Sequence, residues 1–189
     1  FFNFDGDKFL ICNIDFKMFR VYNKLLTKYP LPTKMATSGF LFGVGDTLCQ
    51  YIEQHKSDKF QVNFKRLARF SFFGCFLGAP ILNFHYGTIL QRISTKTTPM
   101  ATLVKVAFDQ TFFATFFITY IFTVMPLLEG KGLEVGKQAV QEKLWPSLLT
   151  NWKIWPAVQF LNFYLVPLRF HMLVVNSVAV FWNAYMSWM

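Results

Sequence analysis

Few side chains in this 189-residue sequence could bind a solute or take part in a reaction. Several of those stand in apolar stretches, where a polar group is energetically costly. Groups of this kind usually face other protein groups or trapped water rather than lipid. They could therefore line or gate a polar passage, in which carboxylates would favour cations or repel anions unless they are paired. The candidates are two carboxylates, three amides and one guanidinium: Asp46, Gln50, Asp109, Gln159, Asn162 and Arg169.

A simpler interpretation exists for each candidate, because amides in any helical membrane protein can bond neighbouring helices. Asp46 stands near the end of its apolar stretch and could be a capping or snorkelling carboxylate. Lys105 and Asp109 are four residues apart on one helix face, and the sequence favours a closed ion pair there over a charged pore lining. His85 is more typical of hydrogen-bonded packing than of a proton relay.

Motifs for enzymatic chemistry are absent from the sequence. It contains no GxGxxG, P-loop, HExxH, GxSxG or CxxC pattern. His55, His85 and His171 lack ligand-like spacing, and the three cysteines show neither metal-like spacing nor an obvious pairing. We therefore predict no metal, no cofactor and no enzymatic activity, and expect a transport or structural role.

The composition places the chain in a membrane. Hydrophobic residues make up 53%, aromatic residues 20% and charged residues only 15%, which is too few to cover a soluble domain. The net charge is +9, and the basic residues stand just outside the apolar stretches. Anionic lipid headgroups are therefore the predicted partner, and nucleic acid is not. Basic residues divide almost equally between the two sides, so the sequence predicts no orientation.

The hydropathy pattern predicts an all-α fold, a polytopic transmembrane helical bundle of four or five spans with short interfacial amphipathic helices. The last apolar run is too long for one upright span and contains Val166-Pro167, where a kink or turn is expected. If its two pieces each cross separately, the spans number five. The predicted spans are residues 33–52, 64–90, 100–127 and 152–188, with amphipathic helices over 18–29 and 129–145.

Two glycine pairs predict how the first two spans pack. Gly39 and Gly43 stand in the first span, and Gly74 and Gly78 stand in the second, each pair with GxxxG spacing. Small residues at this spacing let two helix backbones approach closely. We therefore expect a tight hairpin, with a kink in the second span at Pro80.

Residues 1–17 form an N-terminal extension of unclear role, ahead of one membrane domain over residues 18–189. The extension carries acidic residues and no arginine, unlike a mitochondrial presequence. The chain begins with Phe, which is compatible with removal of a targeting segment, with a missing initial stretch, or with translation from Met18.

A family resemblance rests mainly on the C-terminal third. The pattern Trp152-x2-Trp155-Pro156-x2-Gln159-x2-Asn162-Phe163-x2-Val166-Pro167, followed by Trp182-x2-Tyr185-x-Ser187, closely resembles the signature of the Mpv-type, 22 kDa peroxisomal membrane protein family. Gly43-x-Gly45-Asp46-x3-Gln50 and Asp109-Gln110 also resemble its pattern. The resemblance covers about Met18 to Met189. One departure is His171, which stands where the family usually has Arg, while Arg169 stands two residues earlier.

The resemblance implies a small integral protein of the mitochondrial inner membrane or the peroxisomal membrane, usually with four spans. Some members are reported to form weakly selective channels for small solutes, and others are tied to mitochondrial DNA maintenance. Our prediction is a mitochondrial inner-membrane passage for small solutes. The alternative is an accessory subunit, without transport activity, in a larger mitochondrial membrane complex. A homo-oligomer fits the first prediction.

Overall fold

The computed structural model describes residues 17–54 and 60–188, and the side chains of residues 20–54 and 60–183. The N-terminal extension before residue 17 and His55 lie outside the described residues. All regular elements within the described residues are helical, which confirms the predicted all-α class.

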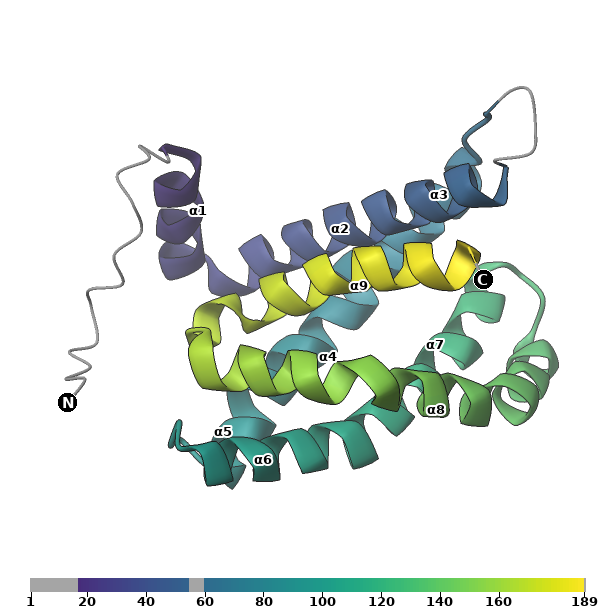
Figure 1. The fold of residues 1–189 in the computed structure, drawn as a ribbon. Coiled ribbons are helices and arrows are strands. Elements are labelled where there is room, and N and C mark those ends of the chain that lie inside the picture. Colours follow the sequence, from purple (N-terminus) through teal and green to yellow (C-terminus); the bar gives the residue numbers. More distant parts are fainter. Residues whose placement is uncertain (1–16, 55–59, 189) are drawn as a thin grey trace.

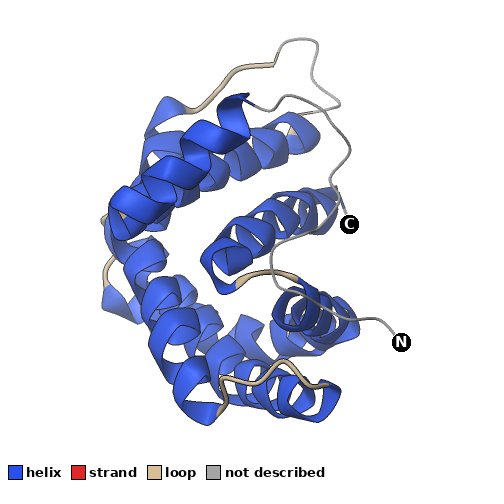
Figure 2. Ribbon diagram, turned by 90° about the vertical axis from the view of Figure 1, so that its left-hand side faces the viewer, coloured by secondary structure: helices blue, strands red, loops and turns tan. Residues whose placement is uncertain are grey.

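Five helical rods follow a short first helix, α1 (Lys17–Lys28), and successive rods run in opposite directions (Figure 1). Viewed along their length, the rods form an arc (Figure 2). Rods 2, 3 and 5 each combine several elements. Rod 1 is α2 (Pro30–Glu53); rod 2 is α3 (Phe64–Phe72), η1 (Phe73–Gly78), α4 (Ala79–Phe84), η2 (His85–Ile89) and α5 (Leu90–Ile93); rod 3 is α6 (Pro99–Phe108), η3 (Asp109–Phe113) and α7 (Ala114–Leu128); rod 4 is α8 (Leu133–Leu165); rod 5 is η4 (Leu168–Phe170) and α9 (His171–Trp188).

The rods begin and end where the sequence supplies caps and turns. Pro30 opens α2, where a missing N–H costs nothing. Asn63 caps α3 by accepting a hydrogen bond from the Arg66 N–H, and Thr98 caps α6 in the same way. Gly130 and Gly132 take positive φ values of 75° and 86° in the turn between α7 and α8.

Rods 2 and 3 contain three π-helical turns: η1, η2 and η3. The first ends two residues before Pro80, where proline removes a backbone donor and disturbs the preceding turn. The other two begin at His85 and Asp109. A π turn adds a residue to the helix and rotates the side chains that follow, and such turns are frequent at functional sites.

The fourth rod differs from the prediction. A separate interfacial helix was expected over residues 129–145 and a span from residue 152, but α8 is one helix of 33 residues. Pro146 and Pro156 lie inside it without ending it. Its first half packs on α7, and a Cβ added at Gly136 would lie 3.1 Å from the Thr123 backbone. This close packing places the segment against α7 in the bundle, as a continuation of the rest of α8.

The predicted break at Val166-Pro167 is present and is a reversal of direction. α8 ends at Leu165, and Val166 and Pro167 are extended, with ψ angles of 135° and 141°. The short η4 then leads into α9, which runs back beside α2 (Figure 1).

Two helical segments among the described residues are long and apolar enough to cross a membrane by themselves. They are rods 2 and 3, residues Phe64–Ile93 and Pro99–Leu128. The other rods carry more polar side chains, so a bundle of four or five spans stays a prediction.

Three of the four predicted packing glycines lie where α2 meets rod 2. A Cβ added at Gly39 would lie 2.9 Å from Cβ of Cys75, and one at Gly43 would lie 2.5 Å from Oγ of Ser71. A Cβ at Gly74 would lie 2.6 Å from the Phe42 ring. Gly78 differs, because its nearest contacts are ordinary ones of 3.5 Å and more, to Phe73 and Phe117.

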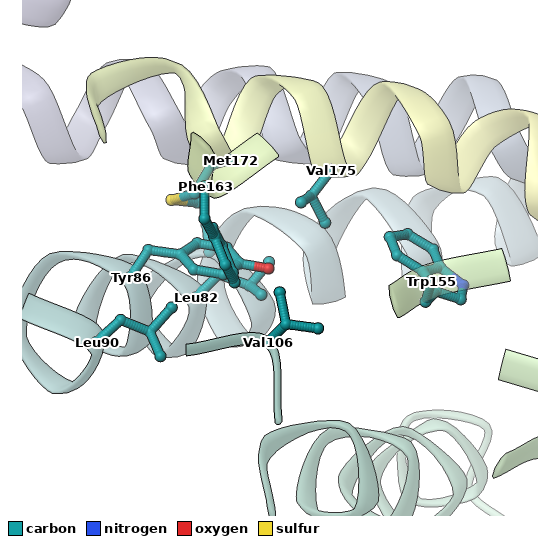
Figure 3. Close-up of a cluster of buried hydrophobic side chains, with 9 residues drawn as sticks. Leu82, Tyr86, Leu90, Val106, Trp155, Phe163, Met172 and Val175 are labelled. Carbon is teal, nitrogen blue, oxygen red and sulfur yellow. The ribbon is translucent and has the colours of Figure 1, made fainter. Parts of the chain in front are cut away.

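An apolar core joins the rods near the end that carries α1 and the α8–α9 turn. Rods 2 to 5 all contribute to it (Figure 3). Figure 3 shows Tyr86, Leu90, Phe163 and Met172 grouped together, with Trp155 set apart from them. The described buried members are Ala79, Leu82, Tyr86, Leu90, Val106, Trp155, Phe163, Met172 and Val175, and we call them the core cluster.

Candidate functional site: a buried polar network and its cavity

The centre of the site is a buried pair between rods 2 and 3. Nε2 of His85 lies 2.7 Å from Oδ1 of Asp109, and the two side chains are only 1% and 2% exposed. Each residue is the first of a π-helical turn, η2 or η3. The His85 ring stacks on Phe113, with ring centres 3.5 Å apart and planes within 5°. Two helix irregularities thus bring an imidazole and a carboxylate together inside the protein.

Amide side chains surround the second oxygen of Asp109. Gln110 and Gln159 donate hydrogen bonds to Oδ2, at 2.8 Å and 3.0 Å. Gln159 also donates to the Tyr86 hydroxyl at 3.0 Å. Both carboxylate oxygens therefore have partners, as a buried charge requires.

Two asparagines extend these contacts along α8. Asn162 donates to Oε1 of Gln159 at 3.2 Å, and Asn151 donates to Oε1 of Gln110 at 2.8 Å. Trp155, Gln159 and Asn162 follow helical spacing, share one face of α8 and are all buried. We call the connected set the buried network: His85, Tyr86, Asp109, Gln110, Asn151, Gln159 and Asn162.

A cavity of about 270 Å³ lies beside the buried network, and all five rods contribute to its wall. Tyr86, Asp109 and Gln159 line one part of it, together with Leu82 and Val175 of the core cluster. From there the cavity runs between α7, α8 and α9 past Trp155 and Trp182. Amides and one hydroxyl interrupt an otherwise apolar wall, at Gln110, Ser147, Asn151, Asn176 and Asn183.

A separate apolar groove of about 550 Å³ lies between α4 and α6, and His85 and Phe113 are part of its wall. Phe113 lines both hollows, while Asp109 lines only the inner cavity. The His85–Asp109 pair therefore stands between an outer aromatic groove and the inner cavity.

Asp46 and Gln50 lie in a different cluster, where α2 meets the start of α3. Oδ1 of Asp46 accepts a hydrogen bond from Nε of Arg66 at 2.6 Å, and Oδ2 accepts one from Gln50 at 2.7 Å. Gln50 also accepts a bond from the Asn63 N–H at 2.6 Å. Neither Asp46 nor Gln50 lines the cavity. The structure therefore separates them from Asp109, Gln159 and Asn162, which it brings together.

Arg66 bonds Asp46 through Nε and Glu53 through both of its terminal nitrogens, at 2.6 Å and 3.0 Å. We expect Arg66→Lys to lower the free energy of unfolding by about 1 kcal/mol, because a lysine cannot replace this fork of donors. Thermal unfolding in detergent, followed by circular dichroism, would measure the change. Arg92→Lys, at an exposed position, is the control. If both variants are equally stable, the three hydrogen-bond donors of Arg66 contribute nothing to the stability of the fold.

Arg169 is exposed in η4 and lies over its neighbour Phe170, 5.1 Å from the ring centre. His171, at the position where the family resemblance expects Arg, is buried, and its Nε2 lies 2.9 Å from the Val166 carbonyl oxygen. The structure therefore does not bring Arg169 into the buried network.

The predicted closed pair between Lys105 and Asp109 is wrong. Asp109 faces His85, Gln110 and Gln159, whereas Nζ of Lys105 donates to the Lys96 carbonyl oxygen at 3.2 Å. The turn from Lys105 to Asp109 is a regular α-helical one, but the carboxylate meets His85 of rod 2 and the lysine meets the α5–α6 connection, so packing between rods decides the partners.

Sequence reasoning missed four members of the buried network as site residues: His85, Tyr86, Gln110 and Asn151. Asn151 continues the helical series of residues 155, 159 and 162, so periodicity could have found it. His85 and Tyr86 carry no such signal, because their partners come from other rods. No cluster of metal-ligating side chains occurs among the residues that the structure describes.

These features define an all-helical protein with a polar network at the centre of its bundle. The chain resembles known proteins over most of its length. The model of the Mpv17 / PMP22 family matches residues 126–187, which include Asn151, Gln159 and Asn162. Protein SYM1 of Saccharomyces cerevisiae is 34% identical over 176 residues, covering 91% of this chain and 89% of SYM1.

Two bovine proteins are similarly related. The mitochondrial inner membrane protein Mpv17 of Bos taurus is 33% identical over 171 residues, covering 90% of this chain and 96% of that protein. Peroxisomal membrane protein 2 of Bos taurus is 34% identical over 171 residues, covering 88% and 86%. No solved structure matches the chain. The chain belongs to the Mpv17 / PMP22 family and is a membrane protein, which confirms the resemblance.

Proposed function

We propose that this protein forms a passage for small polar solutes in the mitochondrial inner membrane. The observation that carries the proposal is the cavity of about 270 Å³ bounded by all five rods, with the buried network at one end. The location is supported by the relation to bovine Mpv17, a mitochondrial inner membrane protein, and the relation to peroxisomal membrane protein 2 supports the peroxisomal membrane as the alternative.

The passage would be gated at the core cluster. Along α8 and α9, Gln159 and Val175 line the cavity, whereas Phe163 and Met172 lie beyond it, towards the α8–α9 turn. Solute in the cavity would meet the buried network and then the part of the core cluster that does not line the cavity, at Phe163 and Met172. Opening would require the side chains of the core cluster to move apart. The amides of the buried network would then offer hydrogen bonds to the solute.

The charge of the lining bears on selectivity. Asp109 contributes a carboxylate to the cavity, but His85, Gln110 and Gln159 already bond its oxygens. Asp46 is bonded to Arg66 outside the cavity. A preference for cations therefore depends on release of Asp109 from its partners as the passage opens.

We propose a non-enzymatic role, because the buried pair lacks a nucleophile. In a hydrolytic triad, a histidine bonded to a carboxylate uses its other nitrogen on a hydroxyl or thiol. Nδ1 of His85 is buried and has no hydrogen-bond partner within the described part of the chain. The pair is therefore better suited to joining rods 2 and 3 than to activating a nucleophile.

The test is single-channel recording of the purified protein in planar bilayers, beside Asp109→Asn and Asp46→Asn. Asp109→Asn should change the conductance or the cation-to-anion permeability ratio by about twofold or more, because it alters the cavity wall. Asp46→Asn is the matched control and should leave both unchanged. Silent bilayers with folded, inserted protein would contradict the proposal, and so would equal effects of the two variants.

The alternative is an accessory subunit of a larger membrane complex without transport activity. It is favoured by the bonded state of both Asp109 oxygens and by the closure of the cavity at the core cluster. Native electrophoresis of mildly solubilised membranes separates the two proposals. Migration only as a monomer or small homo-oligomer would contradict the subunit role.

A further inference from the structure

Positive charge gathers at one end of the bundle. This end carries the end of α1, the start of α2, the α5–α6 connection and the α8–α9 turn (Figure 1). The acidic side chains that the structure describes lie elsewhere: Asp46 and Glu53 at the other end of α2, Glu129, Glu134 and Glu142 around the start of α8, and Asp109 in the buried network. The basic side chains at this end include Lys24, Lys28, Lys34, Arg92, Lys96, Lys105 and Arg169.

Two of these lysines are buried or partly buried beside neutral partners. Lys105 is only 4% exposed, and its ammonium donates to the Lys96 carbonyl oxygen. The partly buried Lys34 donates to Oδ1 of Asn83 at 2.7 Å. Neither forms an ion pair within the described part of the chain. An ammonium has three donors, and burying its charge is costly without an anion.

Other unsatisfied polar atoms lie close by. Oγ1 of Thr102 and Nδ1 of His171 are buried without a partner among the described residues. Thr102 stands three residues before Lys105 and therefore shares its helix face. Lys34 bonds Asn83 of rod 2 and Lys105 bonds the connection that follows rod 2, so both ammonium groups lie beside the last part of that rod. Buried groups left in this state in a folded protein call for a missing partner.

We propose that Lys34, Lys105 and Thr102 form a binding site for a phosphate group. A phosphate monoester or diester supplies the negative charge and the several acceptor oxygens that the two ammonium groups lack. Lys34 and Lys105 stand about 6–9 Å inside the starts of their helices, near the depth of lipid headgroups.

The phosphate group could come from an anionic phospholipid or from a soluble phosphorylated solute. Lys34, Lys105 and Thr102 do not line the cavity, so the site does not depend on the passage conducting. A bound phosphate would join α2 and α6, because Lys34 belongs to the first of these helices and Lys105 and Thr102 to the second.

The experiment uses the purified full chain in non-ionic detergent, with two arms. In one, native mass spectrometry measures binding of phosphatidylglycerol against phosphatidylcholine. In the other, thermal unfolding is compared in inorganic phosphate and in chloride at equal ionic strength. The variants are Lys34→Gln/Lys105→Gln at the site and Lys65→Gln/Lys143→Gln as a control of equal charge, at exposed positions towards the other end.

Each lysine removed from the site should weaken binding about tenfold, the change equivalent to losing a charge-assisted hydrogen bond of ~1.5 kcal/mol. The control should stay within about twofold of the wild type. If the double variant loses binding of phosphatidylglycerol, the ligand is a lipid headgroup. If it loses the stabilisation by inorganic phosphate, the ligand is a soluble phosphorylated solute. The proposal is overturned if the wild type prefers neither phosphatidylglycerol over phosphatidylcholine nor phosphate over chloride. It is also overturned if the control variant loses as much binding as the site variant. If the double variant does not fold, Lys34→Gln alone carries the test.

Discussion

Asp109→Ala is expected to lower the free energy of unfolding by about 3–5 kcal/mol, because it breaks a buried pair and leaves its partners unsatisfied. His85 would lose the only partner of its Nε2 described here, and Gln110 and Gln159 would lose an acceptor. Unfolding by titration with a denaturing detergent, followed by circular dichroism, would measure the effect. Glu142→Ala, at an exposed position, should change stability by no more than about 0.5 kcal/mol.

A double-mutant cycle separates the pair from the general cost of each truncation. If His85 and Asp109 stabilise the fold through each other, His85→Ala/Asp109→Ala should cost about 1–3 kcal/mol less than the sum of the single variants. Additive effects would contradict that coupling. A small effect of Asp109→Ala alone would contradict the central position that the structure gives to this residue.

The α8 part of the site was predictable because its signal is local. Residues 155, 159 and 162 are polar or amphipathic, and their spacing puts them on one helix face in an apolar run. The break at Val166-Pro167 was also predictable, since proline restricts the residue before it. All three side chains are buried, and α8 ends at Leu165.

The partner of Asp109 could not be read from the sequence in the same way. Lys105 is the obvious neighbour on a regular helix, but His85, 24 residues away, is the actual partner. The choice depends on how rods 2 and 3 pack, and the two residues meet where a π turn begins in each rod. Neither the packing nor an added residue in a helix turn leaves a periodic pattern.

The sequence prediction also grouped Asp46 with Asp109 as residues of one passage, and packing separates them. Both are carboxylates in apolar stretches, so the sequence suggested one common role. The partner of Asp46 is Arg66, at the start of the next rod, and the connection between α2 and α3 brings the two together. A hydropathy pattern distinguishes buried from exposed positions, but it does not show which buried groups meet.

The second large effect on stability comes from the packing of α2 against rod 2. Two Gly→Ala variants that change the free energy of unfolding in opposite directions can test it. Gly39→Ala is expected to lower the free energy of unfolding by about 1–3 kcal/mol. Its Cβ would lie 2.9 Å from Cβ of Cys75 and 3.1 Å from the Ser71 carbonyl oxygen, so the two helices would have to move apart. Gly87→Ala is the matched control, because no atom lies within 4 Å of a Cβ there.

Gly87→Ala should instead raise the free energy of unfolding by up to about 1 kcal/mol, since alanine favours a helix more than glycine does. If the two Gly→Ala changes shift the free energy of unfolding in opposite directions, the effect of the close contact at Gly39 is separated from that of helix propensity. Cys75→Gly provides a further check, because it removes the Cβ that Gly39→Ala would meet at 2.9 Å. In that background Gly39→Ala should cost less than in the wild type. An unchanged cost would assign the effect to the Ser71 backbone, and a stabilising Gly39→Ala would contradict the close approach of α2 and rod 2.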